Sequence, residues 1–176
     1  MRILGIDPGY ERLGIAVLEK PAVIKDYGVA KKSSSTQGYG GTRERVIFSE
    51  CFKTSAKLEF SERLKLIGEK IRKIIKKYKP EILAIETLFL NTNQKTVMCV
   101  AEVRGVIVYE ASLAGLKIFE ASPPQIKIAT TGYGRANKIQ IMKMVKVLVK
   151  IEENKTSDDE LDAIAIALTA FAHQRN

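Results

Sequence analysis

The sequence contains few of the residues on which metal and nucleophile chemistry often depend: it has two cysteines and one histidine. Cys51 and Cys99 form neither a disulfide framework nor a CxxC pair. His173 is the only histidine, which argues against a zinc site and against a Ser/His triad. Catalysis by this chain must therefore rest on carboxylates, hydroxyls and lysines.

Long apolar segments are also missing. The sequence has no run of about 18 apolar residues, and its N-terminus lacks the apolar core of a signal peptide. We therefore expect a cytoplasmic protein that makes no contact with a membrane.

The charge is strongly one-sided, because 29 Lys and Arg face 20 Asp and Glu and give a net charge of +9. Such a protein attracts polyanions. The length of 176 residues predicts a single domain over residues 1–176. The segment from about residue 33 to 57 begins in a stretch rich in Ser, Gly and charge, and we predict that it is a flexible insertion.

The N-terminus predicts a strand that ends in an acid. The apolar residues before Asp7 form a buried strand, Pro8-Gly9 turns the chain, and residues 13–18 return as an antiparallel strand. A lone charge at the edge of a core destabilises the folded state by several kcal/mol unless it is paired, hydrated or bound to a metal. Asp7 is therefore a candidate site residue.

The same pattern recurs in the middle of the chain, where the strand 82–85 ends in Glu86. Helical periodicity is clear from Ser61, the expected N-cap, to Tyr78 and over about residues 94–114. Gly105 interrupts the second helix and suggests a closely approaching strand or subunit. Further strands are expected near 23–29, 46–52 and 116–119, and further helices after Ser122, Asn137 and Ser157. This alternation predicts an α/β fold with a mixed sheet flanked by helices.

The last helix provides two more acids. Asp159 and Asp162 are three residues apart and share a face with apolar residues. Asp158 and Glu160 complement the helix dipole, although Asp158 leaves the position of the third acid open by one residue. Four acids without histidine repel one another unless divalent cations lie between them, and oxygen ligands suit Mg²⁺ or Mn²⁺. On a basic protein this set indicates two-ion hydrolysis of a phosphodiester.

Several motifs together resemble the RuvC family of Holliday-junction resolvases, in the ribonuclease H-like superfamily. They are GIDPG at 5–9, AIETLF at 84–89 with Asn91, AEVRGV at 101–106, PQIKIATTGYGRANKIQIMKMV at 124–145 and DELDAIAIA at 159–167. The resemblance implies a five-stranded sheet and a homodimer that nicks four-way DNA junctions symmetrically during recombination and repair. It also implies two Mg²⁺ per active site, for which Mn²⁺ can substitute, and RuvA and RuvB as partners.

The resemblance assigns roles to individual residues. The family's four metal-binding acids fall on Asp7, Glu86, Asp159 and Asp162. Lys127 and Lys138 match basic residues near the scissile phosphate, and Phe89 matches an aromatic residue that stacks on an unpaired base. Arg135, at the tip of the link 131–135, is a further predicted contact to nucleic acid.

Two other functions are compatible with parts of this pattern. One is a nuclease of the same fold that acts on other nucleic acid, as in YqgF-like RNA processing. The other is an actin-like ATPase, whose phosphate loop also begins with a strand, Asp and Gly. That class requires a second domain, for which 176 residues leave no room.

Overall fold

The computed structural model describes residues 1–20, 44–88, 94–149 and 156–174. Its centre is one sheet in the order β3-β2-β1-β4-β5. The strands are β1 Arg2–Asp7, β2 Arg12–Glu19, β3 Arg45–Lys53, β4 Ile82–Glu86 and β5 Lys117–Ala121. β1, β2 and β3 pair antiparallel, whereas β1, β4 and β5 run parallel. The predicted mixed five-stranded sheet with an antiparallel N-terminal hairpin is confirmed.

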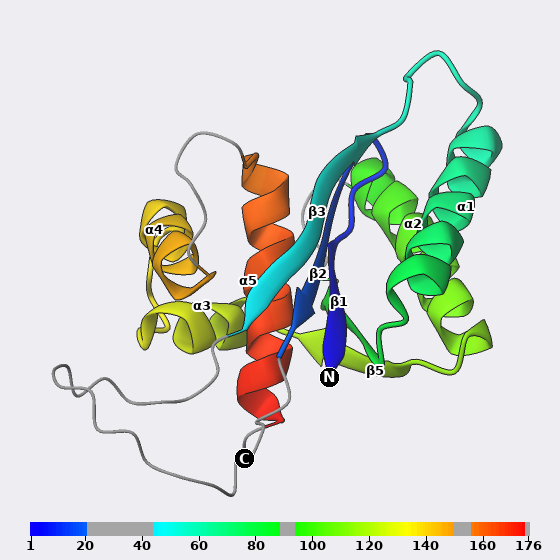
Figure 1. The fold of residues 1–176 in the computed structure, drawn as a ribbon. Helices are drawn as coiled ribbons and strands as arrows, with labels where there is room; N and C mark the ends of the chain where they lie inside the picture. The colour runs from blue at the N-terminus through cyan, green and yellow to red at the C-terminus, as the bar shows by residue number, and fades with distance from the viewer. Residues whose placement is uncertain (21–43, 89–93, 150–155, 175–176) are drawn as a thin grey trace, which may run out of the picture.

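Helices cover both faces of this sheet (Figure 1). One face carries α1 Phe60–Tyr78 and α2 Gln94–Leu113, and the other carries α3 Pro123–Thr131, α4 Lys138–Val149 and α5 Asp158–His173. Two apolar cores result, one on each side of β1 and β2. The alternation of strand side chains between the faces explains this division, because neighbouring residues of a strand point to opposite sides.

Helix α5 lies unusually close to the sheet. A Cβ atom at Gly5 of β1 would come within 2.2 Å of the Ala163 carbonyl oxygen, and one at Gly14 of β2 within 2.1 Å of the Asp159 carbonyl oxygen. The glycines and the many alanines of α5 therefore allow backbone to approach backbone. This close packing brings the first turn of α5 to the end of β1.

Three predicted helix starts are confirmed by hydrogen bonds. The Glu160 backbone donates to Ser157 Oγ at 3.4 Å, and the Gln140 backbone donates to Asn137 Oδ1 at 2.9 Å. The Ser122 backbone donates to Gln125 Oε1 at 2.8 Å. The predicted cap at Ser61 is wrong, because α1 begins at Phe60 and Glu59, two residues before Ser61, occupies the cap position.

The structure corrects part of the segment predicted as a flexible insertion at 33–57. Residues 45–53 form β3, which pairs with β2 along its length. This strand includes the one predicted at 46–52; alternating hydrogen bonds to β2 give it order that composition did not indicate. Residues 33–43 of the same segment, and the strand expected at 23–29, lie outside the described residues.

Gly105 of α2 has no other part of the described chain near it. A Cβ at this position would meet nothing within 4 Å. The expected close approach of a neighbouring strand is therefore wrong for the described residues, and the approach of a second subunit stays a prediction. None of the helices in the described ranges combines the length and the hydropathy that a membrane crossing requires.

Candidate active site

Two acids lie at one edge of the sheet because they end neighbouring strands. Asp7 is the last residue of β1 and Glu86 is the last residue of β4. These strands are parallel, with Ile6 opposite Ile85. The carboxyl ends of parallel neighbours meet at the same edge, which is where α/β proteins place their ligands.

The first two turns of α5 bring two further acids to this edge. Asp162 and Asp159 are both near enough to Asp7 to disfavour its ionised form. Burial first, and then the charges of Asp162, Glu86 and Asp159, raise the pKa of Asp7 from 3.8 to about 7. The pKa of Glu86 is also raised, by burial and by Asp162. Four acids from three distant parts of the sequence thus form one electrostatically coupled cluster, named here the acid cluster.

A cleft of about 310 Å³ opens beside the acid cluster. Its polar wall contains three of the four acids together with two lysines and an asparagine: Asp7, Glu86, Asp162, Lys127, Lys138 and Asn137. Its apolar wall is formed by Pro123, Ile126, Ala136, Ile141 and Ile166. The cleft therefore joins α3, α4 and α5 to the ends of β1 and β4, and it combines charge with an apolar surface as ligand sites commonly do.

Lys138 provides positive charge inside this cleft. Its Nζ lies 3.0 Å from Asp162 Oδ2 and 3.8 Å from Asp158 Oδ2. Burial raises the pKa of Asp162, and the hydrogen bond from Lys138 opposes that shift. In return Asp162 raises the pKa of Lys138, so this lysine is protonated at neutral pH.

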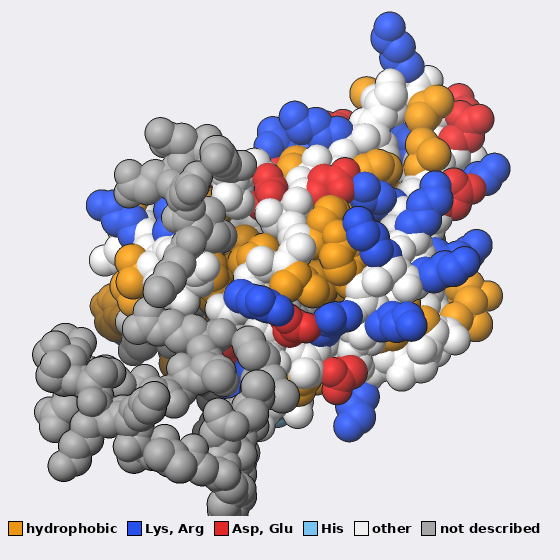
Figure 2. All heavy atoms as spheres, viewed as in Figure 1, with side chains coloured by type: hydrophobic (Ala, Val, Ile, Leu, Met, Phe, Trp, Pro, Cys, Tyr) orange, Lys and Arg blue, Asp and Glu red, His pale blue; other side chains and the backbone are white. Residues whose placement is uncertain are grey.

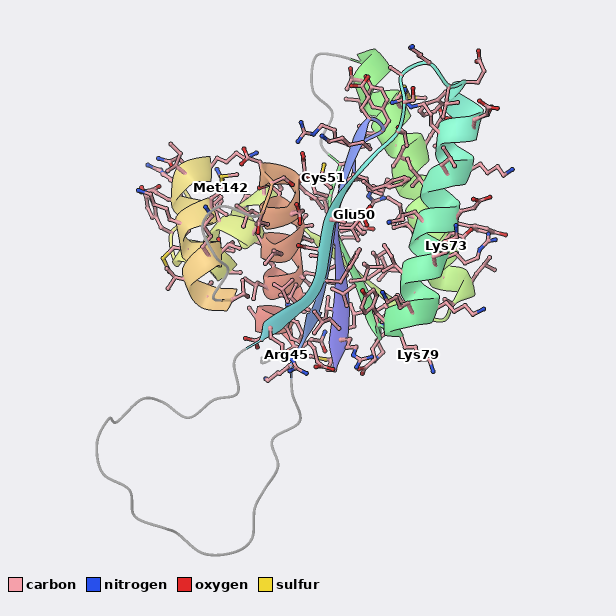
Figure 3. All side chains as sticks on the ribbon, turned by 45° about the horizontal axis from the view of Figure 1, so that its top comes forward. Arg45, Glu50, Cys51, Lys73, Lys79 and Met142 are labelled. Carbon is pink, nitrogen blue, oxygen red and sulfur yellow. The ribbon has the colours of Figure 1, made fainter. Side chains whose placement is uncertain are left out.

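Asp159 differs from the other three acids because a second cation holds it. Arg12 of β2 donates to Asp159 Oδ2 from Nε at 2.9 Å and from Nη2 at 2.5 Å. Cys51 of β3 donates to the same oxygen from Sγ at 3.2 Å, and Figure 3 labels this cysteine on β3. Burial acts to raise the pKa of Asp159, but the hydrogen bonds from Cys51 and Arg12 outweigh it and the pKa is lowered.

The two candidates for the third acid are placed differently. The Asp158 side chain is 67% exposed and the Asp159 side chain is 22% exposed. Asp159 contributes to the field at Asp7, whereas Asp158 is not among the charges that shift the pKa of Asp7 and lies 3.8 Å from Lys138 Nζ. The geometry therefore favours Asp159 as the member of the acid cluster.

The donor set fits a hard divalent cation, although the side chains are not arranged as a ready-made cage. Carboxylate oxygens are the preferred ligands of Mg²⁺ and Mn²⁺. Within the described residues, no three His, Cys, Asp or Glu side chains converge on one metal position. The reason is local: Arg12 engages Asp159 and Lys138 engages Asp162. Asp7 and Glu86 have no such cation among their hydrogen-bond partners in the described part of the chain.

The remaining predicted residues differ in how the structure places them. Lys127 of α3 lines the cleft, and its role near the scissile phosphate stays a prediction. Arg135 is exposed in the link between α3 and α4, outside the cleft lining. Phe89 lies outside the described residues.

Sequence reasoning missed three residues around the site. Arg12 and Cys51 approach Asp159 from strands more than 100 residues away in sequence, so no local pattern indicates them. Arg104 of α2 donates to the Glu86 carbonyl oxygen at 3.4 Å and pairs with Glu120 of β5 at 2.7 Å. A signal existed for Arg12 alone, because it lies in the predicted hairpin close to Asp7.

Comparison with known proteins agrees with this site. The family model described as crossover junction endodeoxyribonuclease RuvC matches residues 25–170. A protein of that name from Halothermothrix orenii is 41% identical over 168 residues, which cover 96% of this chain and 90% of the relative. The chain belongs to the RuvC family.

Solved RuvC structures share the fold. Thermus thermophilus RuvC superposes with a TM-score of 0.81 and 27% identity, covering 99% of this chain and 96% of the other. The same protein in complex with a Holliday junction substrate gives a TM-score of 0.83 and 26% identity, over 99% and 95% of the two chains. The sheet and helices described above are therefore those of a RuvC nuclease, and the predicted ribonuclease H-like class is confirmed.

Proposed function

We propose that this RuvC-family chain is a Mg²⁺-dependent endonuclease that resolves four-way DNA junctions by paired, symmetric nicks. The observation that carries the proposal is the acid cluster beside a cleft that also contains two lysines. The acids come from β1, β4 and α5, and no structural role requires like charges to gather there. The family relatives named as crossover junction endodeoxyribonucleases support the substrate.

Asp7, Glu86, Asp159 and Asp162 would hold the metal ions. When bound, Mg²⁺ or Mn²⁺ activates a water molecule and stabilises the leaving oxygen at phosphorus. The cluster would favour two ions per site, because four carboxylates supply more negative charge than one divalent ion neutralises. Rearrangement of Asp159 and Asp162 away from Arg12 and Lys138 would accompany metal binding.

The lysines of the cleft have a role that does not need the metal. Lys138 of α4 and Lys127 of α3 line the cleft together with three of the acids. A phosphodiester that enters the cleft would lie within reach of both these lysines and the acids. Lysine side chains there would neutralise negative charge that develops on the phosphate oxygens.

The surface charge supports binding of a large polyanion. The net charge is +9, and Figure 2 shows Lys and Arg side chains gathered over α1 on the face in view. Arg135 adds an exposed cation next to the cleft, and Phe89 remains the proposed stacking residue. Each phosphate contact releases counterions, so affinity for DNA should fall steeply as salt increases.

A homodimer would supply the two active sites that symmetric nicking requires. Helix α2 exposes Met98, Tyr109 and Leu113 by 62%, 60% and 66%, at spacings that place them with Gly105 along one side. Exposed apolar side chains in such a row favour burial against a partner. We propose that two copies pair through this stripe, named here the α2 stripe, and that RuvA and RuvB are cytoplasmic partners.

A cleavage assay with defined substrates tests the proposal. A synthetic four-way junction and a linear duplex of the same sequence are each incubated with Mg²⁺ or with chelator. We expect paired nicks at symmetric positions in the junction with Mg²⁺ alone. Equal cutting of the duplex, or cutting in chelator, would overturn the proposal, and cutting of an RNA substrate in preference would favour the RNA-processing alternative.

A further inference from the structure

Arg63 is a buried cation that the active-site chemistry does not use. Arg63 is only 6% exposed, although arginine is rarely buried unless it is paired. It lies near the start of α1, where the helix dipole disfavours positive charge. Local helix stability therefore does not explain an arginine at this position, and the explanation must come from its contacts.

Those contacts all belong to the turn of the N-terminal hairpin and to the residue that follows β3. Arg63 Nη2 donates to the Tyr10 carbonyl oxygen at 2.8 Å, and Nε donates to Thr54 Oγ1 at 3.0 Å. Its guanidinium carbon also lies 4.9 Å from the centre of the Tyr10 ring. Among the described residues that bind its guanidinium, none is an acid, so the cation interacts with a carbonyl, a hydroxyl and an aromatic ring.

Thr54 extends this arrangement to both carbonyls of the turn. Its Oγ1 donates to the Tyr10 carbonyl oxygen at 2.6 Å, and its backbone donates to the Glu11 carbonyl oxygen at 3.1 Å. Arg63 and Thr54 therefore fix two consecutive peptide groups. Carbonyls that would otherwise bind water have defined partners in the protein.

The turn held in this way connects two residues of the active site. Asp7 precedes Tyr10 by three residues, and Arg12 follows it by two. On the opposite face of the hairpin, the backbone of Gly14 lies directly against the Asp159 carbonyl. The hairpin is thus held between α1 on one face and the first turn of α5 on the other.

We infer that Arg63 is a positioning residue for the acid cluster. It holds the hairpin turn from the α1 side, so that Asp7 and Arg12 keep their places relative to Asp159 and Asp162. This inference rests on the proposed metal site, since positioning matters only if the acids act together. Arg63 itself touches neither the cleft nor the acids.

Metal binding measured without DNA tests this role. Mg²⁺ is titrated calorimetrically into the full chain and into Arg63→Met and Arg63→Lys, well below the melting temperature of each variant. Met removes both hydrogen bonds, and we expect it to weaken Mg²⁺ binding by tenfold or more. Lys keeps the charge but cannot reproduce the planar two-donor geometry, and we expect partial recovery, to within about threefold of the parent.

A matched control separates positioning from general loss of stability. Ile74→Val removes one methyl group from the buried face of the same helix, about three turns further along. It should lower the melting temperature and leave Mg²⁺ affinity unchanged. For junction cleavage, Arg63→Met should raise the Mg²⁺ concentration for half-maximal rate and leave KM for the junction unchanged.

Specific outcomes would overturn the inference. Mg²⁺ binding by folded Arg63→Met that equals the parent, or an equal weakening by Ile74→Val, would show that Arg63 is only structural. If Arg63→Met does not fold, Thr54→Val takes its place, because it removes the hydroxyl shared by Arg63 and Tyr10. An unchanged Mg²⁺ affinity of Thr54→Val would likewise show that the contact is only structural. A parent chain that binds no Mg²⁺ would instead overturn the proposed metal site and this inference with it.

Discussion

Lys138 and Asp162 join the first residue of α4 to the second turn of α5, with Nζ 3.0 Å from Oδ2. The lysine therefore lies inside the cleft at the point where a phosphate would pass the acids. Lys143, five residues further along, is exposed on the same helix and does not line the cleft. Substituting each lysine in turn therefore compares the effect of a cation in the cleft with that of a cation on the surface.

Lys138→Met should reduce the rate of junction nicking by roughly 100-fold, the usual effect of removing one group that stabilises transition-state charge. Lys143→Met should change that rate by no more than about threefold. Single-turnover nicking at saturating enzyme measures the chemical step for both variants. Similar rates for the two variants would remove Lys138 from the mechanism.

Asp7→Asn should abolish detectable nicking and leave binding to the junction in chelator nearly unchanged. The substitution removes one negative ligand from the acid cluster but no phosphate contact, and the loss of several kcal/mol of metal-assisted stabilisation corresponds to about 1000-fold or more in rate. Gel-shift titration in chelator and nicking in Mg²⁺ measure the two properties separately. Nicking by the variant at the parental rate would refute the assignment of Asp7.

The pKa of Asp7, raised to about 7 mainly by burial, predicts how stability depends on pH in chelator. Between about pH 4 and pH 7 the folded protein binds a proton that the unfolded chain has released. The free energy of unfolding must therefore fall as pH rises through this range. Glu86 and Asp162 act in the same direction because their pKa values are also raised, whereas Asp159 acts in the opposite one.

Urea unfolding at pH 5, 6, 7 and 8 measures this dependence. One pKa unit corresponds to about 1.4 kcal/mol, and after allowance for partial solvation we expect the parent to lose roughly 2 kcal/mol over the range. Asp7→Asn should show a flatter profile and exceed the parent in stability at pH 8. A parental stability that rises with pH in chelator would contradict the coupling within the acid cluster.

Gly5→Ala should destabilise the fold by about 3 kcal/mol or more, because the new Cβ would lie 2.2 Å from the Ala163 carbonyl oxygen and force α5 from β1. Gly134→Ala is the matched control, since its Cβ would meet Ile128 at an ordinary distance of 3.4 Å. Its effect should stay within about 1 kcal/mol. Thermal or urea unfolding distinguishes the two, and equal stability of both variants would show that α5 does not need this close approach.

Leu113→Glu should convert the proposed dimer to a monomer, because it places a charge in the α2 stripe. Val147→Glu on α4 alters a side chain of nearly equal exposure, 64% against 66%, outside that stripe. Light scattering coupled to gel filtration should give a monomer mass for the first variant and a dimer mass for the second. A dimer that survives Leu113→Glu would place the contact between subunits elsewhere.

The parts of the site that could be predicted from sequence are those that depend on local pattern. A short apolar strand ending in an acid occurs twice, and each instance places a carboxylate at the end of a core strand, as found for Asp7 and Glu86. The position of Asp162 three residues after Asp159 likewise predicted a shared helical face. These inferences needed only strand alternation and helix periodicity.

The parts that could not be predicted depend on contacts between distant segments. Arg12 and Asp159 are separated by 147 positions, and only the packing of α5 on the hairpin brings them together. Ile139 of α4 shows a second limit: the side chain is apolar, yet the residue is 65% exposed, because only a narrow face of α4, with Val145 and Val149, is buried. Periodicity indicates which side of a helix faces the core, but not how many residues on that side the rest of the protein buries.

The origin of the acids at opposite ends of the chain has a consequence for protein synthesis. Asp7 lies in the first described strand, whereas Asp159 and Asp162 belong to α5, which follows all the described strands in the chain and docks against β1 and β2. A partly translated chain that stops before α5 therefore lacks two of the four acids proposed to hold the metal, whatever its earlier segments have already folded into. By the proposed mechanism, hydrolytic activity requires the carboxylates of α5 and would be acquired only after that helix has been made.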